Sequence, residues 1–172
     1  LDGRDIQTYG ARELARRLGV LPQGSVTPDG MSVADLVARG RYPHRRAFAP
    51  WSDDDEQAVR AALDATGVTD LLHRPVDALS GGQRQRVWLA MALAQDTPAL
   101  LLDEPTTYLD ITHQLDMLDL FRRINTEQGR TVVAVLHDLN QAARYADEIV
   151  AMRAGRIVAH GAPEQVVTEE LM

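Results

Sequence analysis

An aspartate and a glutamate stand where a short apolar run ends. Asp103 and Glu104 follow three consecutive leucines and precede Pro105. In open α/β sheets, ligands bind beyond the carboxyl ends of the strands, so polar residues at this point indicate a functional site. One acid can hold Mg²⁺ while the other orients and deprotonates an attacking water. The alternative is a solvated acidic turn that merely ends a strand.

A histidine is expected to join these acids from the next strand. Residues 99–102 and 131–136 are short apolar runs, typical of parallel strands covered on both faces, and residues 111–128 between them have helical spacing. In a right-handed βαβ unit both strands end at one edge, which places His137 beside the acids. There it could hydrogen-bond a phosphate oxygen or the attacking water. Alternatively, its ring only satisfies a loop carbonyl.

A glycine-led helix forms the second candidate site. Ser80 and Gln83 have capping-box spacing, so a helix should start at Ser80 and run to about Gln95. Gly81 and Gly82 destabilise a first turn, but their bare N–H groups can approach an anion at the positive helix end. An ordinary cap that permits tight packing is the alternative. A second phosphate-type site at Asp103, only 20 positions after Gln83, favours the functional interpretation.

The remaining elements are expected to position these sites. They are a strand or hairpin tail at residues 1–6, a helix at 11–18 stopped by Gly19, a run at 20–23 that leads into a loop, helices at 33–38 and 54–65 behind Ser32 and Ser52, and a hairpin at 149–160. The acidic run at residues 53–56 fits the dipole at a helix start better than a metal site.

Composition excludes several classes of function. The formal net charge is −7 and the basic residues are scattered, so nucleic acid is not an expected partner. The chain contains no cysteine, which fits a reducing compartment. Its apolar runs fall far below the roughly 20 residues that cross a bilayer. All 18 basic residues are arginine.

Five motifs, in order, resemble those of the ATP-binding cassette (ABC) ATPases. Residues 79–83 are similar to the signature motif, 99–104 to the Walker B strand and 107–110 to the D-loop. Gln23 resembles the Q-loop glutamine, and His137 the switch histidine. The resemblance implies an α/β fold: a truncated P-loop NTPase-like (RecA-like) parallel sheet core plus an α-helical subdomain. The implied division is 1–26 as core remnant, 27–95 as helical subdomain and 96–172 as core.

The resemblance also implies a role for each matched residue. Glu104 would be the general base, and Asp103 and Gln23 would serve Mg²⁺. His137 would sense the γ-phosphate, and Asp110 would link two active sites. ATP would lie between two head-to-tail subunits, with the signature residues of one reaching the nucleotide of the other. Those residues are Ser80, Gly81, Gly82 and Gln83.

This chain departs from the family in one respect: it lacks the P-loop motif that binds the phosphates. A P-loop needs G-x-x-x-x-G-K-[ST], and a chain without lysine cannot contain one. We therefore expect the parent protein to carry the P-loop in a piece that precedes residue 1. We also expect this chain alone to be inactive, a folded remnant that neither hydrolyses ATP at a useful rate nor binds it tightly.

Within the ABC family, the chain most resembles the ATPases of importers of ferric siderophores, haem and cobalamin. This resemblance is carried by residues 37–44 (Val-Ala-Arg-Gly-Arg-Tyr-Pro-His) and 108–119. It implies an import ATPase, most similar to those for ferric siderophores, at the cytoplasmic face of the inner membrane. Its partners would be a second ATPase subunit, transmembrane permease subunits and, indirectly, a substrate-binding protein. ABC-type ATPases of DNA repair or translation share the signature and remain an alternative.

Overall fold

The computed structural model describes residues 1–24, 29–46, 49–107 and 109–169. Contacts divide the chain into two compact units, Leu1–Val135 and Leu136–Met172. This boundary follows contacts, whereas the three-part division above follows the motifs and stays a prediction. The expected start of the helical subdomain, Thr27, lies outside the described residues. In the described part, no helix is both long enough and apolar enough to cross a bilayer.

The first unit is built on a parallel three-stranded sheet. Strands β1 (Leu18–Leu21), β2 (Ala99–Leu102) and β3 (Thr131–Ala134) lie in the order β1-β2-β3. Helix α5 (Ile111–Gln128) connects β2 to β3 over the bounds that the sequence predicts. The expected parallel βαβ unit is confirmed, and the carboxyl ends of all the strands meet at one edge.

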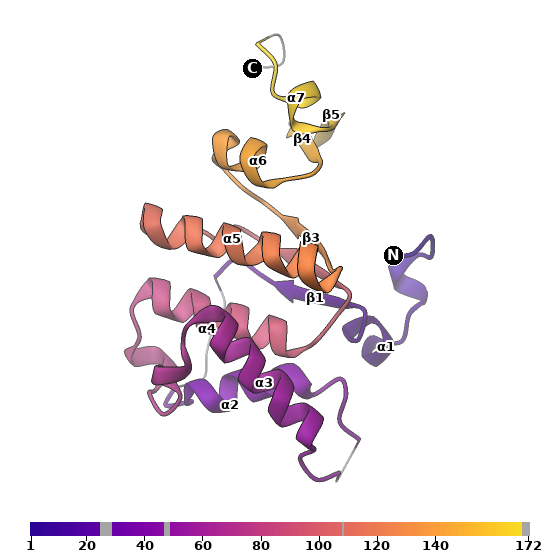
Figure 1. Cartoon of the computed structure of the whole chain (residues 1–172). Helices are drawn as coiled ribbons and strands as arrows, with labels where there is room; N and C mark the ends of the chain where they lie inside the picture. The colour runs from indigo at the N-terminus through magenta and orange to yellow at the C-terminus, as the bar shows by residue number, and fades with distance from the viewer. Residues whose placement is uncertain (25–28, 47–48, 108, 170–172) are drawn as a thin grey trace. The chain divides into compact units, whose positions relative to one another are not determined.

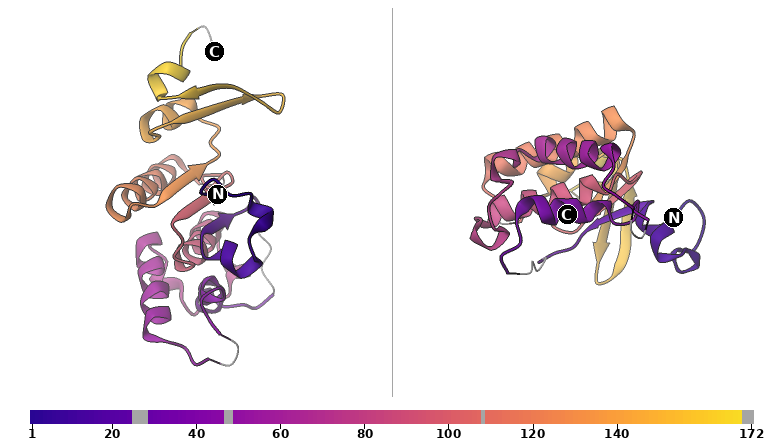
Figure 2. Two further views of the ribbon diagram at one scale, coloured as in Figure 1. Left: turned by 90° about the vertical axis from the view of Figure 1, so that its right-hand side faces the viewer. Right: turned by 90° about the horizontal axis from the view of Figure 1, so that it is seen from below.

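A helical layer packs against this sheet. Helix α4 (Gly81–Ala94) lies between the sheet and helices α2 (Val33–Ala38) and α3 (Asp53–Thr66), as Figures 1 and 2 show. Ser32, Ser52 and Ser80 are the N-caps of α2, α3 and α4, as predicted. Each serine accepts a hydrogen bond from the N–H group three residues later, which satisfies a first-turn donor. Short 3₁₀ segments join the helices: η2 (Arg39–Arg41), η3 (Thr69–Leu71) and η4 (Val76–Ala78).

The predictions for the N-terminal segment were wrong. Residues 1–6 form a turn and the start of η1 (Ile6–Thr8), because Asp5 caps the Gln7 N–H instead of entering a strand. Helix α1 ends at Ala15, so the expected helix over 11–18 is too long. Gly19 is not a helix stop but part of β1. A Cβ there would lie 2.8 Å from Leu100 Cδ2. Glycine thus allows the close approach of β1 to its neighbour.

The expectation that the strands are covered on both faces was also wrong. One face, with Leu21, Leu100 and Leu102, is buried. The residues that alternate with these along the strands form the other face, which is exposed: Val20, Leu101, Val133 and Val135 are 42%, 37%, 54% and 45% exposed. Among the described residues of the first unit, the helices thus leave this second face uncovered. Apolar side chains therefore line a sheet face that this chain leaves in water.

The second unit contains a short helix, a hairpin and a final helical turn. They are α6 (Leu139–Tyr145), β4 (Ile149–Arg153), β5 (Arg156–Gly161) and α7 (Pro163–Val166). The predicted hairpin is confirmed: β4 and β5 are antiparallel. Ala154 and Gly155 both have positive φ, at 49° and 75°, as a tight hairpin turn requires.

Candidate functional site

The parallel register brings two of the predicted residues to one edge of the sheet. Leu21 of β1 pairs with Leu102 of β2 at the last position of each strand. The ladder continues one step, because the Asp103 N–H donates to the Leu21 carbonyl oxygen at 2.9 Å. Asp103 is therefore fixed at the edge where β1 leads, through Pro22, to the exposed Gln23. A carboxylate and an amide thus follow adjacent strands at their carboxyl ends.

Glu104 adopts a backbone conformation that is uncommon for a residue with a side chain. Its φ is +49°, in the left-handed region. Such a conformation costs on the order of 1–3 kcal/mol and persists where surrounding contacts enforce it, often at functional sites. Here the Thr107 N–H donates to the Glu104 carbonyl at 3.2 Å, and the Thr107 hydroxyl donates to Glu104 Oε2 at 3.1 Å. Thr107 therefore holds both the backbone and the carboxylate of the predicted base.

Sequence reasoning missed this function of Thr107. A threonine three residues after an acid is a known spacing for local hydrogen bonds, and that spacing is the signal that was present. The left-handed backbone at Glu104 had no comparable signal, because glutamate has no preference for it.

The tip of helix α4 has the geometry that the sequence predicts. Ser80 Oγ accepts from the Gln83 N–H at 3.3 Å, and Gln83 Oε1 accepts from the Ser80 N–H at 3.2 Å. This capping box does not use the N–H groups of Gly81 and Gly82, which begin the helix and have no intrahelical acceptor. Ser80 and Gly81 are exposed. A positive helix end with uncommitted amides therefore faces solvent.

An arginine steadies the turn that leads into this tip. Arg84 Nη2 donates to the carbonyl oxygens of Asp77 and Leu79, at 3.2 and 3.3 Å. Because Arg84 lies in the first turns of α4 and its acceptors precede Ser80, the approach to the helix is tied to the helix itself. The tip is a braced element rather than a loose loop.

Asp110 is the N-cap of α5. Its Oδ1 accepts from the His113 N–H at 3.0 Å, and the His113 ring nitrogen Nδ1 lies 2.9 Å from each carboxylate oxygen. Hydrogen bonds from the His113 backbone and side chain hold the pKa of Asp110 below its ordinary value. The linking role expected for Asp110 stays a prediction. Its D-loop neighbour Tyr108 lies outside the described residues.

His137 belongs to the second unit. It precedes Asp138, the N-cap of α6, whose side chain accepts from the Gln141 N–H at 3.0 Å. The grouping of His137 with Asp103 and Glu104 stays a prediction. Within the part of the chain that the structure describes, no cluster of three or more His, Cys, Asp or Glu residues could hold a metal ion. The acidic run at 53–56 therefore forms no such cluster.

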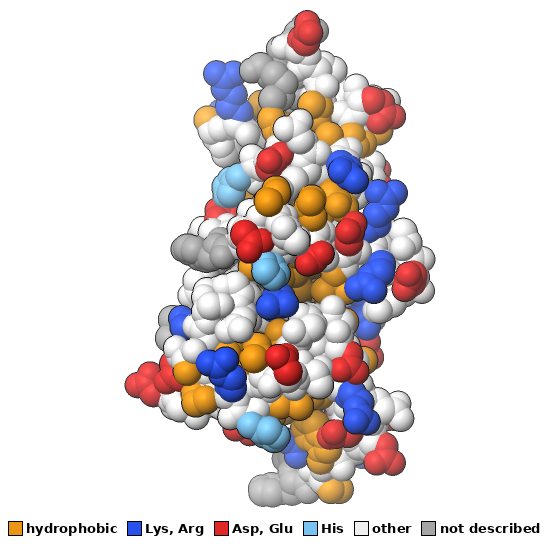
Figure 3. Space-filling view, turned by 60° about the vertical axis from the view of Figure 1, so that its left-hand side comes forward, with side chains coloured by type: hydrophobic (Ala, Val, Ile, Leu, Met, Phe, Trp, Pro, Cys, Tyr) orange, Lys and Arg blue, Asp and Glu red, His pale blue; other side chains and the backbone are white. Residues whose placement is uncertain are grey.

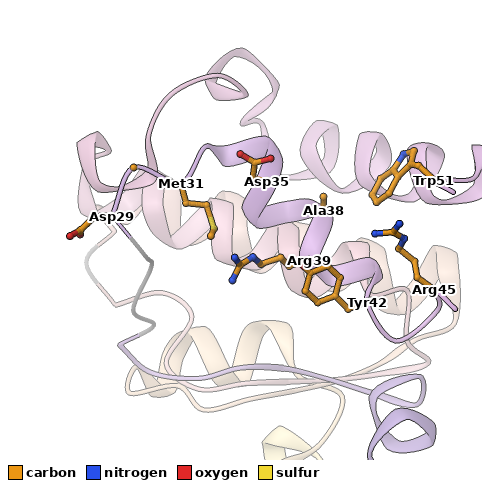
Figure 4. A pocket seen from close by; sticks show the side chains of 9 residues that line it. Asp29, Met31, Asp35, Ala38, Arg39, Tyr42, Arg45 and Trp51 are labelled. Atoms are coloured by element: carbon orange, nitrogen blue, oxygen red, sulfur yellow. The ribbon is translucent and has the colours of Figure 1, made fainter. Parts of the chain in front are cut away.

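A pocket of about 460 Å³ lies in the helical layer (Figure 4). Its walls include Arg39 and Tyr42, and at one end Arg45 stacks on Trp51 with the guanidinium carbon 5.4 Å from the ring centroid. Tyr42 is 57% and Trp51 39% exposed. Both aromatic side chains therefore lie partly at the surface.

The parallel sheet, the acids at its edge and the braced helix tip define a nucleotide-binding cassette of the ABC type. The family model for the ABC transporter domain matches residues 1–107. The chain belongs to this family.

Two curated relatives align over the whole chain. The ferric enterobactin transport ATP-binding protein FepC of Escherichia coli is 57% identical over 172 residues, which are all of this chain and 64% of FepC. The petrobactin import ATP-binding protein FpuD of Bacillus anthracis is 54% identical over the same length, 63% of FpuD. The chain thus spans less than two thirds of these relatives.

A solved structure gives the same fold. The ATP-binding cassette MJ0796, in a dimeric post-hydrolysis state bound to ADP and Pi, aligns with a TM-score of 0.80 and 25% identity. The alignment covers 95% of this chain and 72% of that one.

Proposed function

We propose that the protein containing this chain is the ATP-hydrolysing subunit of an ABC importer, with a ferric siderophore as cargo. The observation that supports it most strongly is the edge of the sheet, where Asp103 is fixed by the strand ladder and Glu104 by Thr107. The names of the relatives FepC and FpuD, which share more than half of the residues aligned, support the direction of transport and the cargo. The permease and the binding protein, rather than this subunit, would contact the cargo.

Glu104 acts in this mechanism as the general base. Its carboxylate accepts the proton of the water that attacks the γ-phosphate, and the Thr107 hydroxyl keeps that carboxylate oriented before the water arrives. Orientation matters because a prearranged base needs no reorganisation during the reaction. His137 supplies a hydrogen bond to the γ-phosphate or to the attacking water.

Asp103 and Gln23 fit a magnesium site. Both present oxygen ligands, and they follow adjacent strands at one edge. Mg²⁺ is commonly held by one or two protein oxygens together with substrate phosphates and water, so a larger protein cluster is not needed. When bound, Mg²⁺ neutralises charge that develops on the phosphate oxygens. Asp103 and Gln23 would hold it at the edge of the sheet.

The helix tip serves a nucleotide held by a second subunit. Gly81 and Gly82 present N–H groups at the positive end of a 14-residue helix, and Ser80 adds a hydroxyl. The exposure of this tip supports a ligand that arrives from outside the chain. The dimeric state of MJ0796 supports a second cassette as its source. Asp110 would link the two sites.

The open face of the sheet supports a larger protein around this chain. An apolar face that includes Leu101 and Val133 is unfavourable in water, so a further segment is expected to cover it. The same segment would supply the P-loop lysine. We propose that the 172-residue chain alone neither binds ATP tightly nor hydrolyses it. Calorimetric titration with Mg-ATP tests this, and micromolar affinity would contradict it.

The helical layer is proposed to dock on the permease. Its pocket combines exposed aromatic side chains, Tyr42 and Trp51, with Arg39 and Arg45. Aromatic and arginine side chains are enriched at protein interfaces. On the face in Figure 3, acidic and basic side chains are interspersed, which does not favour nucleic acid. Co-purification of a membrane protein, rather than DNA or ribosomes, is the expected outcome of a pull-down with the whole protein.

The ATPase proposal is tested by Glu104→Gln in the whole protein. Loss of a general base lowers turnover by roughly 10²–10⁴-fold. Nucleotide binding should persist, since the amide keeps the shape of the carboxylate. Glu127→Gln, at an exposed position near the end of α5, is the control and should keep wild-type turnover. Unchanged hydrolysis in Glu104→Gln would remove Glu104 from the proposed mechanism.

A further inference from the structure

The C-terminal end of α4 is held by side chains from outside the helix. The last carbonyl groups of a helix have no intrahelical partner. Arg41 Nη1 donates to the Ala94 carbonyl oxygen at 2.9 Å, and His44 Nε2 lies 2.7 Å from the Gln95 carbonyl oxygen. Because a carbonyl oxygen only accepts, Nε2 is the nitrogen that carries the hydrogen. Two basic side chains thus cap the negative end of the helix.

Arg41 is itself fixed by a buried carboxylate. Arg41 Nε donates to Asp55 Oδ1 at 2.9 Å, and both side chains are 7% exposed. Asp55 also accepts from the Ser52 hydroxyl at 2.8 Å in the capping box of α3. Burial alone would raise the pKa of Asp55, but the hydrogen bonds from Arg41 and Ser52 outweigh it, so the pKa lies below its ordinary value. Asp55 therefore stays charged and keeps Arg41 aimed at α4.

The same end of α4 is attached to the sheet. The Gln95 side chain donates through Nε2 to the carbonyl oxygens of Ala15 and Leu18, the latter at 3.2 Å. Leu18 begins β1, the strand that leads to Gln23. The η2 backbone is also pressed on α4, since a Cβ at Gly40 would lie 2.3 Å from the Met91 carbonyl oxygen. The end of α4 is thus a junction between α3, η2 and β1.

We propose that Arg41, Asp55 and His44 are positioning residues that fix the direction of α4, and hence the place of the Ser80 tip. A helix is a stiff rod, so a small rotation at its held end displaces the far end by more. The tip lies 14 residues from Ala94, about 20 Å at 1.5 Å per residue. The consequence for turnover rests on the proposed ATPase function, in which the tip must reach a nucleotide on a second subunit.

The test separates positioning from stability. Arg41→Met leaves Asp55 buried without its partner and should destabilise the fold. Arg41→Met combined with Asp55→Asn removes both charges, so much of the stability should return, while Ala94 still lacks its cap. If the residues position α4, this double variant of the whole protein has at least about 10-fold lower turnover at saturating ATP, because small misplacements cost large factors in rate. Its KM for ATP should stay within about twofold, as the tip serves the other subunit's nucleotide after binding.

A second readout does not depend on hydrolysis. This chain has no cysteine, so once any cysteine elsewhere in the whole protein is replaced by serine, spin labels can be attached at Gln85→Cys on α4 and Asp119→Cys on α5. In the double variant the distance between the labels should shift or broaden by an ångström or more. Arg60→Met and Asp54→Asn, both exposed on α3, are the matched controls and should leave turnover and distance unchanged.

The outcomes distinguish the two proposals. An unchanged label distance with turnover within twofold of wild type in the double variant would overturn the positioning role. If the wild-type whole protein hydrolyses no ATP, the proposed function fails, but the label distance still decides whether Arg41 and Asp55 position α4. The same measurement on His44→Phe decides the part of His44.

Discussion

A methyl group at Gly40 is the sharpest test of how η2 packs on α4. Gly40 is buried and has no positive φ, so alanine fits its backbone. The obstacle is steric. The added Cβ would lie 2.3 Å from the Met91 carbonyl oxygen and 3.1 Å from both Ala94 Cβ and the Gln95 nitrogen, whereas ordinary contact begins at 3.4 Å. About 1 Å of movement is therefore required, and main-chain atoms of a helix cannot rotate away as a side chain does.

The expected cost of Gly40→Ala follows from two opposing effects. Overpacking a filled site costs typically 1–3 kcal/mol, and the upper end applies because the nearest atom is backbone. Replacing glycine by alanine in a helical segment returns about 0.5–1 kcal/mol. The net loss in free energy of unfolding is about 2 kcal/mol. With a urea slope of about 2 kcal/mol per molar, the midpoint falls by about 1 M.

Urea unfolding of the whole protein, followed by tryptophan fluorescence, measures this shift. Trp88 lies in α4 and reports on the packing in question. The control is Gly10→Ala, where φ is −64° and a Cβ would meet nothing within 4 Å. It should stay within about 0.5 kcal/mol of wild type. Equal midpoints for Gly40→Ala and Gly10→Ala would refute the close packing of η2 on α4.

Three further predictions concern charge, backbone and the open face. Asp55→Asn should lower stability at neutral pH. Because folding lowers the pKa of Asp55, its carboxylate contributes its full stability above the ordinary value of 3.8 and loses it as the pH falls through the lower folded-state value. The urea midpoints of variant and wild type should therefore converge at a pH below 3.8. Gly67→Ala should cost about 1 kcal/mol in thermal unfolding, because Gly67 ends α3 at φ +63° with space for a Cβ. Val133→Ser should destabilise the whole protein but leave the isolated chain within about 0.5 kcal/mol, as urea titration of both would show.

Elements defined by local chemistry could be predicted from the sequence. The capping box of α4 depends only on residues three positions apart, and Ser80 and Gln83 make it as expected. Helix α5 has a capping aspartate at one end and Gly129 at φ +66° at the other, so both of its bounds were predictable. The acids at the end of β2 were also found, because an apolar run followed by charged residues is itself a local pattern.

Features that depend on distant contacts could not be predicted. Gly19 resembled a helix stop, since nothing nearby shows that it lies against Leu100. Asp55 looked like one more acid in a helix start, yet its partner Arg41 lies 14 positions earlier. The open face of the sheet also depends on which elements are available to cover it. A continuous apolar run cannot reveal that.

The charges at the edge of the sheet explain why this chain should not hold ATP unaided. Asp103 and Glu104 are acids, and the amide of Gln23 carries no charge, so the edge repels a triphosphate. The positive helix tip is exposed and tied to the turn before it by Arg84, and in the proposed function it serves a nucleotide on another subunit. The cations that would hold the phosphates, a P-loop lysine and Mg²⁺, must therefore come from beyond these residues. If the proposed function holds, a cassette divided in this way should hydrolyse ATP only when fully assembled, which would tie turnover to assembly.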